Sequence, residues 1–311
     1  MGQIWPATVA GLVFGSIYAL MALGYTLIYR VLNVINFAHA ESFMVGTFGT
    51  LFAARWLGIL PGPDSVRDGA GAVVALGVVL VAAVVFAAAA SAALELAVFG
   101  PLRRRGGGPA PTMIAALGAS LFLQEVFGLW RGRDLEPFPR LLEHTPLFTV
   151  FGVGVSAVHI VVVVVALLVA LGADRFVNST QLGAAIRATA QDRDTATLMG
   201  INTGRVILLT FVVAGVTAGV GATLFMTVYE NTYYFIGFVI GIKSFTAALL
   251  GGMGNVRGAI LGGYLVGVME NYGAIAFGAE WKDTVVVAVL VLVLLVRPTG
   301  VLGTRLQTVR V

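Results

Sequence analysis

Long uninterrupted apolar runs constrain the fold of this chain more than any other feature of its sequence. Residues 73–90 read VVALGVVLVAAVVFAAAA and residues 157–171 read AVHIVVVVVALLVAL. A helix needs roughly 20 apolar residues to cross a hydrocarbon core about 30 Å thick, whereas barrel strands are short and alternate in polarity. These runs do not alternate, and 59% of all residues are hydrophobic while only 11% are charged. The sequence therefore predicts an all-α polytopic membrane protein.

Nine apolar segments are candidate crossings, and eight to ten crossings fit their lengths. The third segment is long enough to contain a break, and the second begins with several polar residues. We expect all of them to belong to one transmembrane domain that covers residues 1–311. The segments are residues 5–29, 31–56, 71–99, 111–130, 152–172, 203–229, 237–254, 256–278 and 283–296.

The distribution of Lys and Arg predicts the orientation of the chain, because short cytoplasmic loops carry an excess of these residues. With nine crossings and a cytoplasmic C-terminus, twelve of the nineteen basic residues lie inside and six lie outside, while Lys243 falls within a segment. The opposite orientation inverts this ratio. We therefore expect an external N-terminus and a cytoplasmic C-terminus.

Several classes of function are disfavoured by what the sequence lacks. The chain has no cysteine, and His39, His144 and His159 do not have the spacing of a zinc site. No GxxxxGK[ST] motif occurs, and the run GGMGNVRGAILGG lacks both the preceding strand and the glycine spacing of a dinucleotide loop. Basic residues are scattered between apolar runs, which argues against nucleic-acid binding. We expect no catalytic residue, metal site or cofactor in this chain.

Glycines recur at four-residue spacing, which clears one face of a helix for close approach by another backbone. The first and sixth segments each carry such a pair and also share a tyrosine at the same offset, a faint echo that leaves an internal repeat open. The glycines for which we predict helix packing are Gly11, Gly15, Gly215, Gly219, Gly254, Gly258 and Gly262.

Four polar side chains stand close together in the stretch VLNVINFAHAESF, residues 31–43: Asn33, Asn36, His39 and Glu41. Asparagine competes for backbone hydrogen bonds, and non-helical backbone at membrane depth persists only where protein or water satisfies it. The pattern predicts that the helix of the second segment is broken at 33–41. His39 and Glu41 would then lie about 12–16 Å from the cytoplasmic surface. The four polar residues either line a translocation pathway or hold the broken helix together.

Lys243 and Glu270 are ionisable groups in neighbouring segments, where an unpaired charge is costly. Counted at 1.5 Å per residue, both lie about 9–12 Å below the outer surface. They are placed to form a salt bridge across two helices. The alternative is that they supply the polar lining of an external vestibule.

The stretch from 173 to 202 is the longest cytoplasmic loop, with a helix predicted over 180–199 that stops at Gly200. Its composition fits an amphipathic connector at the membrane interface. It also fits a docking helix that directs Leu182, Ile186 and Leu198 at the membrane domain and offers its charges to a soluble partner. The docking charges would be Arg187, Asp192, Arg193 and Asp194. Outside, residues 131–150 could form a surface helix or contact an external partner.

Four stretches together resemble a known family in order along nearly the whole chain. They are GSIYALMALGYTLIYRVLNVINFAHAESFMVGTF, RATAQDRDTATLMGIN, IKSFTAALLGGMGNVRGAILGG followed by VMEN, and VLLVRPTGVLG. They are similar to LivH-type permeases, the membrane subunits of ABC importers for branched-chain amino acids. Ala40 departs from this pattern, which usually has glycine there, and alanine has little access to positive φ.

The resemblance implies a permease of the bacterial inner membrane that works with several partners. A second homologous permease would complete the translocation pathway, a periplasmic protein would deliver the amino acid, and lipid would surround the pair. Two cytoplasmic ATPase subunits would bind ATP and Mg, and residues 173–202 would be the coupling loop between them and this chain. Each ATP-driven closure would move this loop and switch access.

Two alternatives remain open on the sequence. Permeases for urea or short amides share much of the same signature. An ion-coupled secondary transporter would instead use His39, Glu41 and Lys243 as a relay, and would need no ATPase.

Overall fold

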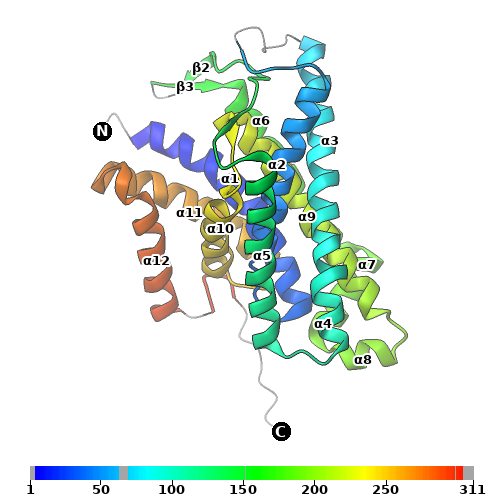
Figure 1. Cartoon of the computed structure of the whole chain (residues 1–311). Coiled ribbons are helices and arrows are strands. Elements are labelled where there is room, and N and C mark those ends of the chain that lie inside the picture. The colour runs from blue at the N-terminus through cyan, green and yellow to red at the C-terminus, as the bar shows by residue number, and fades with distance from the viewer. Residues whose placement is uncertain (1–3, 63–68, 151, 298, 304–311) are drawn as a thin grey trace.

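The structure is a computed structural model that describes residues 4–62, 69–150, 152–297 and 299–303. In this part of the chain, nine main helices alternate in direction (Figure 1). The predicted external N-terminus and cytoplasmic C-terminus, residues 1–3 and 304–311, lie outside the described residues. The nine helices are α1 (Ile4–Leu32), α2 (His39–Trp56), α3 (Gly69–Leu94), α5 (Pro109–Arg131), α6 (Ala157–Ser179), α9 (Thr203–Tyr229), α10 (Ile236–Gly251), α11 (Val256–Phe277) and α12 (Lys282–Val296).

These helices coincide with the nine predicted segments, so the all-α membrane fold is confirmed. Six helices in the described residues are long and apolar enough to span a membrane: α1, α3 with its extension, α5, α6, α9 and α11. Helices α2, α10 and α12 have 18, 16 and 15 residues, and so reach only about 22–27 Å. The predicted irregularity in the third segment is a π-helical turn, Glu95–Phe99, which leads into α4 (Gly100–Arg104).

The molecule has an approximate two-fold internal arrangement built from two sets of three helices, α1–α2–α3 and α9–α10–α11. The first helix of each set occupies the centre, and 72% of the residues in its 18-residue apolar stretch are buried. The third helix of each set packs on the first helix of the other set, since α1 lies against α11 and α9 against α3. The predicted echo between the first and sixth segments therefore corresponds to a structural repeat.

Glycines bring these helices into backbone contact. A Cβ atom at Gly11 or Gly15 would lie 2.8 Å from a Cα atom of α11, and one at Gly219 would lie 2.6 Å from the Cα of Val84 on α3. Gly215 meets α3 in the same way, one turn away. Small residues permit such close approach because no side chain keeps the backbones apart.

The third predicted glycine series divides between a turn and a helix. Gly258 and Gly262 of α11 face the backbone of α10. Gly254 has φ +86° and stands in the turn before α11 begins, so it does not belong to the packing face that its spacing predicts. A positive φ of this kind is accessible mainly to glycine.

Each central helix ends at a residue in the left-handed conformation. Asn33 and Glu230 are the two non-glycine residues with positive φ in the described chain, both at 55°. Asn33 follows α1 and precedes α2 by six positions, and Glu230 stands in the same relation to α9 and α10. The break at each end therefore repeats with the helices around it.

Short strands lie at the end of the molecule opposite α8, which we call the hairpin end. Strand β2 (Pro146–Val150) pairs with β3 (Val153–Ser156), and β1 (Glu136–Pro137) pairs with β4 (Asn231–Thr232) beside the Glu230 break. The surface helix considered for residues 131–150 is thus wrong, because hydrogen bonding to β3 and β4 draws this loop into extended backbone. Hydrogen bonds from Arg131, and then from Arg55, hold the pKa of Glu136 below its usual range.

Gly219→Ala is expected to destabilise the protein, because the new methyl group would overlap the backbone of α3. Overpacking of this kind costs about 1–3 kcal/mol. Thermal unfolding in detergent measures the effect, with Gly77→Ala on α3 as the control, since nothing lies within 4 Å of a Cβ atom there. Equal stability of the two variants would contradict backbone contact between α3 and α9.

Candidate functional site

The polar stretch after α1 interrupts the helical structure at residues 33–38. Helix α1 continues through Arg30 to Leu32, Asn33 turns the chain, and α2 begins at His39. The Asn36 side-chain oxygen accepts a hydrogen bond of 3.0 Å from the amide of Ala38. The break predicted within residues 33–41 is therefore present but shorter, because His39, Ala40 and Glu41 already belong to the first turn of α2.

Glu41 is fully buried and its Oε1 atom accepts two hydrogen bonds from α5. Ser120 Oγ and Gln124 Nε2 each donate over 2.8 Å. The other oxygen, Oε2, has no hydrogen-bond partner among the residues that the structure describes, and it points toward Gly237 of α10. The carboxylate thus joins α2 to α5. Only 22% of the residues in the 18-residue apolar stretch of α5 are buried.

His39 is fully buried too, with its ring edge-on to Tyr25 at a centroid distance of 4.9 Å. Gly24 of α1 leaves the space that its Nε2 atom occupies. Ala40 packs on Gly237 and Gly241, so a small residue is required there although a left-handed conformation is not. In this conformation both ionisable groups are buried between the start of α2 and its neighbouring helices.

Lys243 and Glu270 form the predicted salt bridge, with 2.8 Å between Nζ and Oε1. Lys243 also pairs with Asp283 of α12 at 2.7 Å, and Tyr18 of α1 donates a 2.7 Å hydrogen bond to Glu270. Glu270 is buried, whereas Asp283 is 72% exposed. The cluster therefore links four helices and extends from the core to the protein surface.

The predicted coupling segment folds as two helices. Helix α6 continues to Ser179, and α7 (Gln181–Gln191) is followed by α8 (Arg193–Leu198). A single helix over 180–199 is wrong, because the backbone at Asp192 is extended and its side chain caps α8 by accepting from the amides of Asp194 and Thr195. Gly200 stops α8 with φ +84°, as its position predicts.

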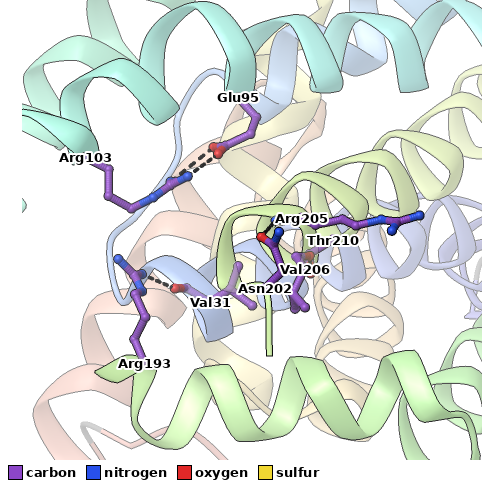
Figure 2. A network of polar contacts seen from close by, with 8 residues as sticks. All are labelled: Val31, Glu95, Arg103, Arg193, Asn202, Arg205, Val206 and Thr210. Atoms are coloured by element: carbon purple, nitrogen blue, oxygen red, sulfur yellow. Dashed lines mark hydrogen bonds and ion pairs between the residues drawn. The ribbon is translucent and has the colours of Figure 1, made fainter. Parts of the chain in front are cut away.

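Two arginines of this segment reach inward to main-chain carbonyl groups. Arg187 donates to the carbonyl of Val177 on α6, and Arg193 donates to the carbonyl of Val31 over 2.6 Å. Figure 2 shows Arg193 directed at the last turn of α1, beside the ion pair of Glu95 with Arg103. The segment is thus attached to the chain just before the break at Asn33.

The outer side of α8 presents the remaining groups to solvent. Asp192 and Asp194 are exposed. The hydroxyl of Thr195 donates a hydrogen bond to Asp192, and the backbone amide of Thr195 donates a second; together they hold the pKa of Asp192 below its usual range. The cap is therefore ionised at neutral pH. Ile186 is buried and Leu182 half-buried, but Leu198 is 87% exposed and Met199 is 78% exposed. The prediction that Leu198 faces the membrane domain is wrong, because the break at Asp192 turns α8 away.

Several contacting residues were not predicted. Ser120 and Gln124 stand four apart on α5, the one available signal of a polar helix face, but a single sequence gives no partner for them. Tyr18 and Asp283 belong to segments whose crossing partners the sequence does not give. Glu95 pairs with Arg103, but nothing in the sequence places this arginine, eight residues later, against it.

A family model described as the permease component of branched-chain amino acid transport systems matches residues 7–294. This chain belongs to that family. The match includes the broken α1–α2 connection, both central helices and the segment containing α7 and α8.

Individual relatives agree with this assignment. The chain is 40% identical to BraD of Pseudomonas aeruginosa, a high-affinity branched-chain amino acid transport system permease protein. The aligned region of 298 residues covers 95% of this chain and 94% of the relative. It is 37% identical to the corresponding LivH permease of Escherichia coli K12, over 94% of this chain and 93% of that protein. A probable LivH permease of Methanocaldococcus jannaschii is 27% identical over 94% of this chain.

Exchanging the charges of the intramembrane pair, by combining Lys243→Glu with Glu270→Lys, is expected to leave the protein unstable. The new carboxylate would face Asp283, and the new ammonium group would face the hydroxyl hydrogen that Tyr18 now donates. Because the exchanged pair keeps its opposite charges, the loss should be smaller than the cost of an uncompensated buried charge, about 3–5 kcal/mol, and thermal unfolding would detect it as a lowered midpoint.

Adding Asp283→Asn to the exchanged pair should raise the midpoint part of the way back, since it removes one repulsion. Wild-type stability of the exchanged pair alone would mean that Tyr18 and Asp283 are not part of the interaction.

Proposed function

We propose that this chain is the permease subunit of an ATP-driven importer for branched-chain or other hydrophobic amino acids. The family match over residues 7–294 carries the proposal. The central pair of helices, α1 and α9, supports the proposal further, because each is followed by a break in the helix and broken helices in repeated folds surround transport pathways. A second homologous permease would complete the pathway.

ATP and Mg would bind to two cytoplasmic ATPase subunits, since this chain carries no P-loop motif. A periplasmic protein would deliver the amino acid at the hairpin end, and the chain would lie in a bacterial inner membrane with lipid around it. This orientation places the N-terminus outside, and α7 and α8 on the cytoplasmic side. The basic residues Arg103, Arg104 and Arg105, at the same end as α8, favour it.

Helices α7 and α8 would serve as the coupling segment. Leu198 and Met199 provide an exposed apolar contact for an ATPase subunit, with Asp192 and Asp194 beside them. Movement of α8 would pass through the Arg193 guanidinium to the Val31 carbonyl, and so to the hinge at Asn33. Interfaces of this kind depend on a few well-packed side chains.

The intramembrane polar groups would act at two levels of the pathway. Asn33, Asn36, His39 and Glu41 would govern the position of α2, and so the width of the route at its α8 end. Lys243 and Glu270, joined to the exposed Asp283, would form the polar wall of a vestibule at the hairpin end. Ion-coupled transport by these groups is the less favoured alternative, because His39 and Glu41 are sealed from solvent in this conformation.

Uptake by proteoliposomes tests the proposed function. Leucine, isoleucine and valine should accumulate only when the second permease, the ATPase subunits, the binding protein and ATP are all present. Urea, supplied with the same components, is the control for the short-amide alternative. Transport driven by an ion gradient without ATPase subunits would refute the importer.

Two variants separate docking of the ATPase from transmission of its movement. Leu198→Glu should weaken ATPase binding about tenfold or more, as expected for a central apolar contact. Arg193→Gln should leave binding intact but reduce uptake per ATP hydrolysed, because the bond to α1 is lost. Pull-down and coupled uptake measure the two effects, and Leu198→Met is the matched control. Normal uptake by both variants would rule out coupling through α8.

A further inference from the structure

A groove lies between α7 and α9, beside the coupling segment. Its volume is about 460 Å³, and its walls are mainly apolar. Leu182 and Ala185 of α7 form one side, and Val206 and Leu209 of α9 form the other. Arg205 stands at its polar end, so the groove combines one cationic group with an apolar floor.

Arg205 differs from two neighbouring arginines at this end of the molecule, Arg103 and Arg193. Arg103 pairs with Glu95, and Arg193 donates to a backbone carbonyl. The guanidinium of Arg205 is exposed and forms no ion pair with any residue that the structure describes, while its backbone amide is used to cap α9 through Asn202. Figure 2 shows its side chain extending away from the Glu95–Arg103 pair. Its charge is therefore available to an anion from outside the chain.

In the proposed orientation, the length of α9 would place the groove where the membrane changes from polar to apolar. Helix α9 has 27 residues and is about 40 Å long, which exceeds a hydrocarbon core of about 30 Å. Arg205 is the third residue of this helix and so falls at headgroup level, while Leu209 lies about 6 Å deeper. The order of cation and then apolar wall matches the order of phosphate and then acyl chain in a phospholipid.

We propose that this groove binds an anionic phospholipid, with its phosphate on Arg205 and one acyl chain against Leu182, Ala185 and Leu209. Basic pockets between membrane helices on the cytoplasmic side favour anionic headgroups. The leaflet rests on the orientation given under the proposed function, whereas lipid binding itself is independent of transport. Because α7 is part of the coupling segment, the bound lipid would fix the position of that segment against α9.

Native mass spectrometry of the purified full chain tests the site with phosphatidylglycerol, and with phosphatidylcholine as the zwitterionic comparison. Arg205→Gln should lower phosphatidylglycerol affinity about fivefold, the effect of removing one basic residue near a membrane surface. The charge control is Arg175→Gln, on the exposed surface of α6. Inorganic phosphate added in excess should not displace the lipid, because the acyl chain contributes to binding.

A second pair of variants tests the apolar part of the groove. Ala185→Phe should fill it and reduce binding of both lipids, whereas Ala184→Phe, one position away on the exposed face of α7, should not. Lipid affinities unchanged in both Arg205→Gln and Ala185→Phe would overturn the proposal. It would also be overturned if Arg205→Gln weakened ATPase binding without changing lipid affinity, since the occupant would then be the soluble partner.

Discussion

Backbone contact between α1 and α11, and between α9 and α3, is the constraint on which the rest of the structure depends. Two helices can approach this closely only where at least one of them has no side chain at the contact, so the glycines help determine which helices are neighbours. The third helix of each set therefore packs against the first helix of the other set. This exchange keeps α1 and α9 at the centre, and each is followed by a break in the helix.

Polar groups then fix what the glycine contacts leave free. Helix α5 has little buried surface of its own, and its contact with α2 combines two hydrogen bonds to one carboxylate with aromatic contacts such as Phe48 with Phe127. An unsatisfied buried donor costs more than a made hydrogen bond contributes, so such a group determines position more than stability. The same holds for Lys243, which lies between a buried and an exposed acid on two different helices.

The sequence predicted the membrane class, the nine helices and the family because these follow from apolar length and from motifs read along the chain. It predicted contacts only where symmetry of spacing or opposite charge identified the partner, as with Gly215 and Gly219 or Lys243 and Glu270. Partners such as Gln124 and Asp283 were missed, because the packing angle between helices decides them. Leu198 was misplaced for a local reason: apolar spacing assumes one continuous helix, and the cap at Asp192 interrupts it.

The bond from Arg193 to Val31 has a consequence for how this family can vary. Its acceptor is a main-chain oxygen, which every amino acid at position 31 supplies equally. Mutation can therefore remove the link from the α8 side alone, while the α1 side stays free to change its packing against neighbouring helices. A connection of this form lets the side chain at position 31 change without loss of the contact between α1 and α8.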